Sequence, residues 1–198
     1  MHWKHHLVNI RPRYSKYIPL LLVELLLGVA GVWGQDQSVL TQHNDSGRTG
    51  AYLAEHILLP DRSRDPGYGF RLLYDRPIEG ANSQILYVHS LNVNADGCGR
   101  EPVRGTRNVM FATTDHNMVY AFDADNYEAS GSLAGCIWAT DLSRPGELSG
   151  PGILSTPVID PITNRMWVVS STGNDAYTIQ QFRLASLDIS AIPTGPPS

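Results

Sequence analysis

Cys98 and Cys136 are the two cysteines of this chain, and their thiols offer its most definite covalent chemistry. In an oxidising compartment they can join as a disulfide, which would close a long loop and stabilise the fold by about 3–4 kcal/mol. Two separate thiols are the alternative, because sequence spacing alone does not bring two Cβ atoms within bonding distance. In both cases we expect Cys98 and Cys136 to be structural residues and not catalytic nucleophiles.

Carboxylates gather at one place in the sequence, where Asp115, Asp123 and Asp125 follow one another closely. Carboxylate oxygens are calcium ligands, but the spacing differs from the D-x-[DN]-x-[DN]-G pattern of a calcium-binding loop. A short carboxylate after a strand also accepts backbone N–H groups of the following turn, so we expect a structural role for Asp123. The histidines lack the H-E-x-x-H spacing of a metal site, and Ser155 lacks a G-x-S-x-G elbow. We therefore predict no catalytic residue and no metal ligand.

These aspartates are positioned by a strand hairpin that occurs twice, in residues 109–123 and 165–188. Three equivalences relate the two copies: Met110 with Met166, Phe122 with Leu187, and Asp123 with Asp188. Repetition of this kind is typical of stacked β units such as the blades of a propeller. Asp188 ends the second hairpin as Asp123 ends the first, so we expect Asp188 to be structural as well.

Apolar and polar residues alternate along several segments, as they do in strands that bury one face. The alternation predicts strands at residues 70–76, 85–91, 108–114 and 118–122, with a Gly-rich connection at residues 92–107. A further strand begins at Cys136 and contains Trp138. The Trp138 indole is expected either to pack between neighbouring sheets, with its N–H on a carbonyl, or to fill the core of one sheet.

Four segments carry a family resemblance: NMVYAFDAD at residues 117–125, Ile137-Trp138, GILSTPVID at residues 152–160, and Met166-Trp167-Val168-Val169. Together they resemble the repeat of pyrroloquinoline quinone (PQQ)-type propellers, and the resemblance covers most of residues 39–190. It implies an all-β chain, here a partial β-propeller of about two to three four-stranded antiparallel blades, with aromatic side chains at the blade interfaces. It also implies a secreted or periplasmic protein.

Some members of that family are quinoprotein dehydrogenases. These hold PQQ with a calcium ion on Glu, Asn and Asp ligands, beside a disulfide between adjacent cysteines and a stacking Trp. This chain departs from that pattern, since Cys98 and Cys136 are not adjacent and no segment shows those ligands in a recognisable setting. The resemblance therefore transfers no catalytic residue, and it assigns no cofactor-binding residue.

Residues 1–34 are expected to be a signal peptide. A basic region precedes an apolar run at residues 18–32, which is interrupted by Glu24, and cleavage is predicted before Gln35. An uncleaved membrane anchor is the alternative, although the run is shorter than the ~20 residues that span a bilayer. Residues 35–69 are then expected to form a turn-rich segment, and residues 70–198 an incomplete propeller.

The predicted mature chain has room for about three blades of ~40–50 residues, fewer than the four or more of a closed propeller. Its last hairpin also lacks the strand expected after Asp188, which would leave an edge and an apolar face uncovered. We therefore expect either a fragment of a longer protein or a chain that assembles with another.

Composition narrows the function, because a formal net charge of −4 argues against nucleic-acid binding. Our first hypothesis is an exported, non-catalytic binding or scaffold module with no cofactor. Its partner would be a protein or a carbohydrate, and it would have no membrane span after signal cleavage. The alternative is a truncated part of a PQQ-dependent quinoprotein oxidoreductase, which would use PQQ and calcium. The sequence leaves open whether the chain is an enzyme.

Overall fold

The computed structural model of the chain describes residues 38–45, 47–51, 72, 74–126, 131, 133–147, 150–173 and 178–191. They all lie in the second of two compact units, Asp36–Ser198. The elements of regular structure in these ranges are all strands, so the predicted all-β class is confirmed. Within the same ranges, no helix has the length and hydropathy of a membrane span. The predicted signal peptide lies outside the described residues, as does most of the segment 35–69, and both stay predictions.

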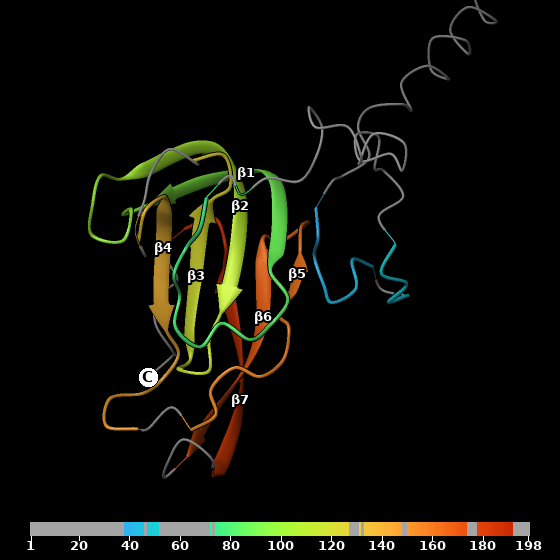
Figure 1. Ribbon diagram of the computed structural model, residues 1–198, viewed down its shortest axis with the longest axis vertical. Coiled ribbons are helices and arrows are strands. Elements are labelled where there is room, and N and C mark those ends of the chain that lie inside the picture. Colours follow the sequence, from blue (N-terminus) through green and yellow to red (C-terminus); the bar gives the residue numbers. More distant parts are fainter. Residues whose placement is uncertain are drawn as a thin grey trace, which may run out of the picture. The chain divides into compact units, whose positions relative to one another are not determined.

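Seven strands form two antiparallel sheets (Figure 1). The first sheet has the order β1-β2-β3-β4, with β1 at Leu86–Ala95, β2 at Val103–Thr113, β3 at Met118–Asp123 and β4 at Cys136–Asp141. The second has the order β5-β6-β7, with β5 at Val158–Asp160, β6 at Arg165–Gly173 and β7 at Ile179–Asp188. The prediction of four-stranded sheets therefore holds for the first, whereas the second has three strands in the part of the chain that is described.

The structure corrects two predicted segments. The connection expected at residues 92–107 is shorter, because β1 continues to Ala95 and β2 begins at Val103. Val93 and Ala95 stay buried while Asn92 and Asn94 face solvent, so the strand alternation persists through this polar stretch. The strand expected at residues 70–76 is wrong for residues 72 and 74–76, which are not in a strand. Pro77 follows them directly, and it has no N–H to donate to a sheet ladder.

The register of the strands confirms the repeat. Met110 pairs with Phe122 across β2 and β3, and Met166 pairs with Leu187 across β6 and β7. One step along each hairpin, Val109 pairs with Asp123 and Arg165 pairs with Asp188. The positions equated from the sequence are therefore equivalent cross-strand pairs in two separate sheets.

Trp138 lies where the two sheets meet. It is fully buried, its ring centroid is 5.8 Å from that of Phe111, and its Nε1 donates a hydrogen bond to the Ile189 carbonyl oxygen at 3.2 Å. Met166 and Leu187 of the second sheet are buried in the same hydrophobic core. Of the two placements expected for Trp138, the structure therefore has the one between sheets.

The N-terminal described residues also tie the two sheets together. Val39 forms an antiparallel bridge with Tyr87 of β1, and the carbonyl oxygen of the next residue, Leu40, accepts a hydrogen bond from Ile159 of β5 at 2.8 Å. Backbone hydrogen-bonding groups at the edge strands β1 and β5 are thus paired by one short segment. This segment holds β1 of the first sheet beside β5 of the second.

The two sheets stack in the same orientation. In the first sheet the face that carries Phe111 and Trp138 is directed at the second sheet, while Met110 lies on the opposite face. In the second sheet Met166 is buried against the first, while Trp167 is 45% exposed on the outer face. Met110 corresponds to Met166, and Phe111 corresponds to Trp167. The Met110 and Met166 faces of the two sheets therefore point in one direction, and the Phe111 and Trp167 faces point in the opposite direction.

Candidate functional site

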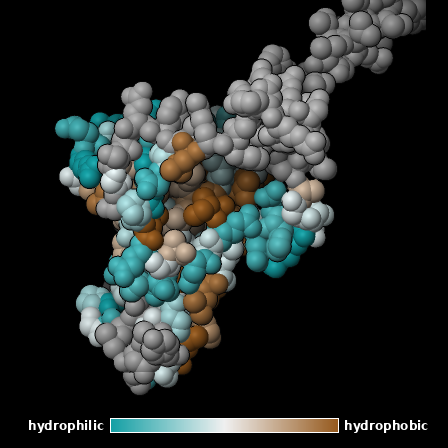
Figure 2. Space-filling model, viewed as in Figure 1, coloured by the Kyte–Doolittle hydropathy of each residue, from teal (hydrophilic) through white to brown (hydrophobic). Residues whose placement is uncertain are grey.

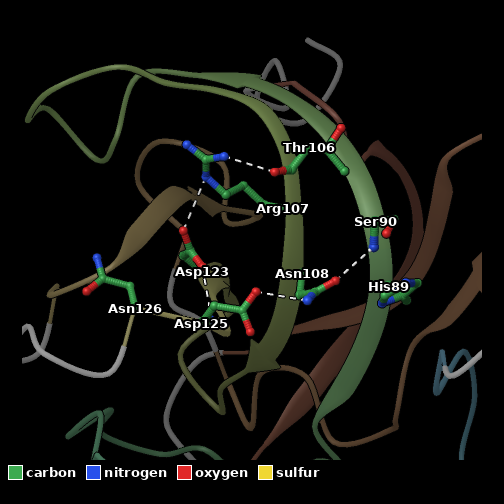
Figure 3. A pocket seen from close by; sticks show the side chains of 8 residues that line it. All are labelled: His89, Ser90, Thr106, Arg107, Asn108, Asp123, Asp125 and Asn126. Atoms are coloured by element: carbon green, nitrogen blue, oxygen red, sulfur yellow. Dashed lines mark hydrogen bonds and ion pairs between the residues drawn. The ribbon is translucent and has the colours of Figure 1, made fainter.

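A polar pocket of about 560 Å³ lies on the first sheet, and side chains from three neighbouring strands and the turn after β3 converge on it (Figure 3). Its lining residues are His89, Ser90, Thr106, Arg107, Asn108, Asp123, Asp125 and Asn126. Every one of them carries a polar or charged side chain. The pocket is therefore suited mainly to hydrogen bonding.

A β-bulge in β1 shapes one wall of the pocket. The pairing of β1 with β2 shifts register between Val88 and Leu91, so His89 and Ser90 together face Asn108. Ser90 has a positive φ of 55°, and its backbone N–H donates to Asn108 Oδ1 at 3.0 Å. Bulges re-aim the side chains around them. Here the bulge holds the Asn108 amide with its Nδ2 directed at Asp125 Oδ2, 2.8 Å away (Figure 3).

The charged groups of the pocket are held by one another. Arg107 Nε lies 3.3 Å from Asp123 Oδ2, and Arg107 also donates to the Thr106 carbonyl oxygen at 2.9 Å. The other carboxylate oxygen of Asp123 accepts the backbone N–H of Asp125 at 3.0 Å. The Asp123 side chain is only 18% exposed, against 40% for Arg107. The Arg107 cation is therefore paired with Asp123, and further hydrogen-bonding capacity remains on its other guanidinium N–H groups, on the His89 imidazole, on the Asp125 carboxylate, on the Asn126 amide and on the hydroxyls.

Asp123 and Asp188, both predicted to be structural, cap turns in the same way. The Oδ1 of each accepts a backbone N–H from two residues further on, that of Asp125 at 3.0 Å and that of Ser190 at 2.9 Å. Partial burial raises the pKa of Asp188, but hydrogen bonds from Ser190 outweigh it, so its pKa lies below the ordinary value. Asp123 differs from Asp188 in that it also pairs with an arginine and lines the pocket.

Cys98 and Cys136 are joined by a disulfide, with their Cα atoms 5.9 Å apart. It links the connection between β1 and β2 to the start of β4. A second concavity, of about 430 Å³, extends from Cys136 to Arg107 and Asp123. The disulfide therefore ties Cys136, on the wall of this concavity, to the connection between β1 and β2.

The sequence singled out Asp123 and Asp125 as structural turn residues and did not predict that a pocket forms around them. It assigned Arg107 and Asn108 to the end of a connection and the start of a strand, whereas both lie inside β2. The contact of Arg107 with Asp123 depends on the pairing of β2 with β3, which places Asp123 opposite Val109. Asp123 ends β3 and pairs with Val109, and Arg107 lies two positions before Val109 on the same side of β2. An arginine at this spacing is the sequence signal that would have found the pair.

Neither Trp138 nor the aspartates of this pocket are arranged to hold PQQ with calcium. Trp138 is fully buried with its N–H bonded to Ile189, so its face is not open for stacking. Three of the four carboxylate oxygens of Asp123 and Asp125 already accept internal hydrogen bonds or pair with Arg107. Within the described ranges, no group of three or more His, Cys, Asp or Glu side chains converges as a metal site would require.

Comparisons of the chain with protein-family models, with curated proteins and with solved structures gave no match. The resemblance to PQQ-type propellers therefore stays a prediction from the sequence segments described above.

Proposed function

We propose that this chain is an exported, non-catalytic binding module built as part of a PQQ-like β-propeller, and that its pocket binds a neutral, polyhydroxylated ligand such as a sugar unit of a glycan. The observation that carries the proposal is the lining of the pocket, which consists entirely of hydrogen-bonding side chains with the arginine already paired. The propeller part rests on equivalent sheets stacked in one orientation, the arrangement that repeated blades adopt.

The chemistry of the lining favours such a ligand over an apolar or an anionic one. An apolar ligand gains its affinity by burying hydrocarbon surface, and the eight lining side chains provide little of it. An anion would face the Asp125 carboxylate and would compete with Asp123 for Arg107. Sugar hydroxyls both donate and accept, so they match the alternating amide, carboxylate and hydroxyl groups of Asn126, Asp125 and Ser90.

The fixed state of the charged groups supports a binding role rather than a catalytic one. General acid–base catalysis needs a group that gains and loses a proton close to the reacting atom. Asp123 is held by Arg107 and by a backbone N–H, and Asp125 is held by Asn108. These contacts hold both side chains in place and pre-orient their remaining oxygens as hydrogen-bond acceptors.

Calorimetric titration of the full chain with methyl glycosides of glucose, galactose, mannose and N-acetylglucosamine tests the proposal. We expect at least one glycoside to bind, and Asp125→Ala to weaken that binding about 10- to 100-fold, the effect of losing a hydrogen bond to a charged group. Asp141→Ala is the matched control, because Asp141 caps a turn through Ser143 but does not line the pocket. Binding of none of the glycosides, or equal affinity in the two variants, would contradict the proposal.

A dye-reduction assay tests the non-catalytic part separately. After incubation with PQQ and calcium, the chain is expected to oxidise neither alcohols nor sugars. Turnover above a PQQ-only blank would favour the oxidoreductase alternative instead.

A further inference from the structure

The polar pocket and the second concavity share one wall. Arg107, Asp123 and Asn126 line both of them, so the pocket of about 560 Å³ and the concavity of about 430 Å³ are direct neighbours. In Figure 3 these three residues lie on the side of the pocket that is away from His89 and Ser90. Each space alone has the size of a small-molecule site, for which about 300–1,000 Å³ is typical. A ligand in the pocket therefore lies beside the second concavity.

The second concavity differs from the pocket in its chemistry. Its lining includes the apolar side chains of Pro102, Val103 and Leu133 together with the charged side chains of Arg100 and Glu101. Figure 2 shows mostly hydrophilic residues over the connection between β1 and β2, at the upper left of the view. Such a mixed lining suits a sugar ring, because its C–H groups pack on aliphatic side chains while its hydroxyls bond to charged groups.

The fold holds the wall of the second concavity in place. The Gly97 carbonyl oxygen accepts the backbone N–H of Arg100 at 3.2 Å. The turn is tight, because a Cβ at Gly97 would lie 2.1 Å from the Glu101 carbonyl oxygen. The disulfide then ties Cys98, in the same turn, to Cys136 on the wall. A wall fixed in this way loses little conformational freedom when a ligand binds, which favours affinity.

We infer that the pocket and the second concavity are two subsites of one groove for a neutral oligosaccharide of at least two linked sugar units, an inference that rests on the proposed function of the pocket. Charge balance favours neutral units, because Arg100 and Arg107 in the second concavity are matched by Glu101 and Asp123. The shared wall is polar, and its Asn126 amide can both donate to and accept from the oxygen groups beside a glycosidic bond. One sugar unit then lies on each side of this wall.

Calorimetric titration of the full chain with methyl glycosides and with disaccharides of the same sugars tests the inference. The disaccharides are maltose, cellobiose, lactose, mannobiose and N,N′-diacetylchitobiose. At least one of them is expected to bind about tenfold or more tightly than the methyl glycosides of its component sugars, since its second unit adds contacts in the second concavity.

Arg100→Ala and Arg104→Ala form a matched pair of variants. Both arginines are exposed, but Arg100 lines the second concavity, whereas Arg104 lines neither space and donates from its Nε to Asn94 Oδ1 at 3.0 Å. Arg100→Ala is expected to lower the ratio of disaccharide affinity to glycoside affinity about three- to tenfold, and Arg104→Ala to leave this ratio unchanged. Far-UV circular dichroism checks the fold of each variant, and Glu101→Gln replaces Arg100→Ala if the latter fails to fold.

The outcomes separate this inference from the proposed function. A methyl glycoside that binds as tightly as every disaccharide would overturn the two-subsite groove while sugar binding in the pocket stands. Equal affinity ratios in Arg100→Ala and Arg104→Ala would have the same meaning. Absence of binding by all of the glycosides and disaccharides would overturn the proposed function and the two-subsite groove together.

Discussion

Trp138 on β4 donates a hydrogen bond from its indole Nε1 to the carbonyl oxygen of Ile189, the residue that follows β7, at 3.2 Å. Both residues are fully buried. A single side chain thus links the last strand of the first sheet to the end of the second, in addition to the backbone contacts of Val39 and Leu40. A buried carbonyl that loses its donor retains the full cost of its desolvation.

Trp138→Phe is therefore expected to lower the free energy of unfolding by about 1–3 kcal/mol, through the orphaned Ile189 carbonyl and the smaller ring. Urea unfolding monitored by circular dichroism measures the change. Trp167→Phe is the control, because Trp167 is 45% exposed, and its cost is expected to stay within about 0.5 kcal/mol. Equal costs at the two positions would show that Trp138 does not hold the sheets together.

Gly152 is expected to tolerate no side chain. Its φ is +67°, and a Cβ there would lie 2.1 Å from the backbone carbonyl carbon and oxygen of Asp115. Its own carbonyl accepts both the N–H and the hydroxyl of Ser171 on β6, so it cannot move away freely. Gly152→Ala is predicted to lower the free energy of unfolding by more than about 3 kcal/mol.

Gly99→Ala separates the backbone effect from the clash. Gly99 has a φ of +75° but has no atom within 4 Å of the added Cβ, so its substitution is expected to cost only about 1–2 kcal/mol. Urea midpoints of the two variants provide the comparison. If Gly99→Ala were as damaging as Gly152→Ala, the close approach of residues 115 and 152 would not be the cause.

Reduction of the Cys98–Cys136 disulfide is expected to destabilise the fold by about 3–4 kcal/mol, because the bond closes a loop with a sequence separation of 38. Thermal unfolding with and without dithiothreitol measures the loss. The double variant Cys98→Ala, Cys136→Ala should unfold at the lower temperature in both conditions. If dithiothreitol left the unfolding temperature of the wild type unchanged, the presence of a stabilising disulfide would be contradicted.

Glu147 is expected to stay ionised in strongly acidic solution. Its carboxylate is paired with Arg183 on β7, whose hydrogen bonds lower the pKa of Glu147 from 4.5 to about 2. Because the folded pKa lies below the ordinary one, the stabilisation by this pair is complete above pH 4.5 and is lost as the pH falls through about 2. The carboxyl ¹³C shift of Glu147 should therefore remain that of the ionised form at about pH 3.

Arg183→Gln provides the control for that titration. Without the guanidinium, the Glu147 carboxyl is expected to titrate close to its ordinary pKa of 4.5. The pair is partly exposed, so the change in overall stability should be small. An unchanged midpoint in Arg183→Gln would mean that the pair does not form in solution.

The hairpins were predicted well from the sequence because the residues that define each hairpin are close together along the chain. Alternation and the recurrence of Met110 in Met166 and of Asp123 in Asp188 were enough to place equivalent pairs in register. The pocket was harder, because Arg107 reaches Asp123 only through the pairing of β2 with β3. The bulge at Ser90 is equally invisible in the sequence, since it is defined by two residues facing a single partner on another strand.

The most direct test of the account is where a bound sugar lies on the molecule. In ¹⁵N-labelled chain titrated with the tightest-binding methyl glycoside, amide shift changes are expected at Ser90, Arg107, Asn108, Asp125 and Asn126, with those of β7 unmoved. Changes centred elsewhere, or no changes at any glycoside concentration, would contradict the proposal that this pocket is the binding site.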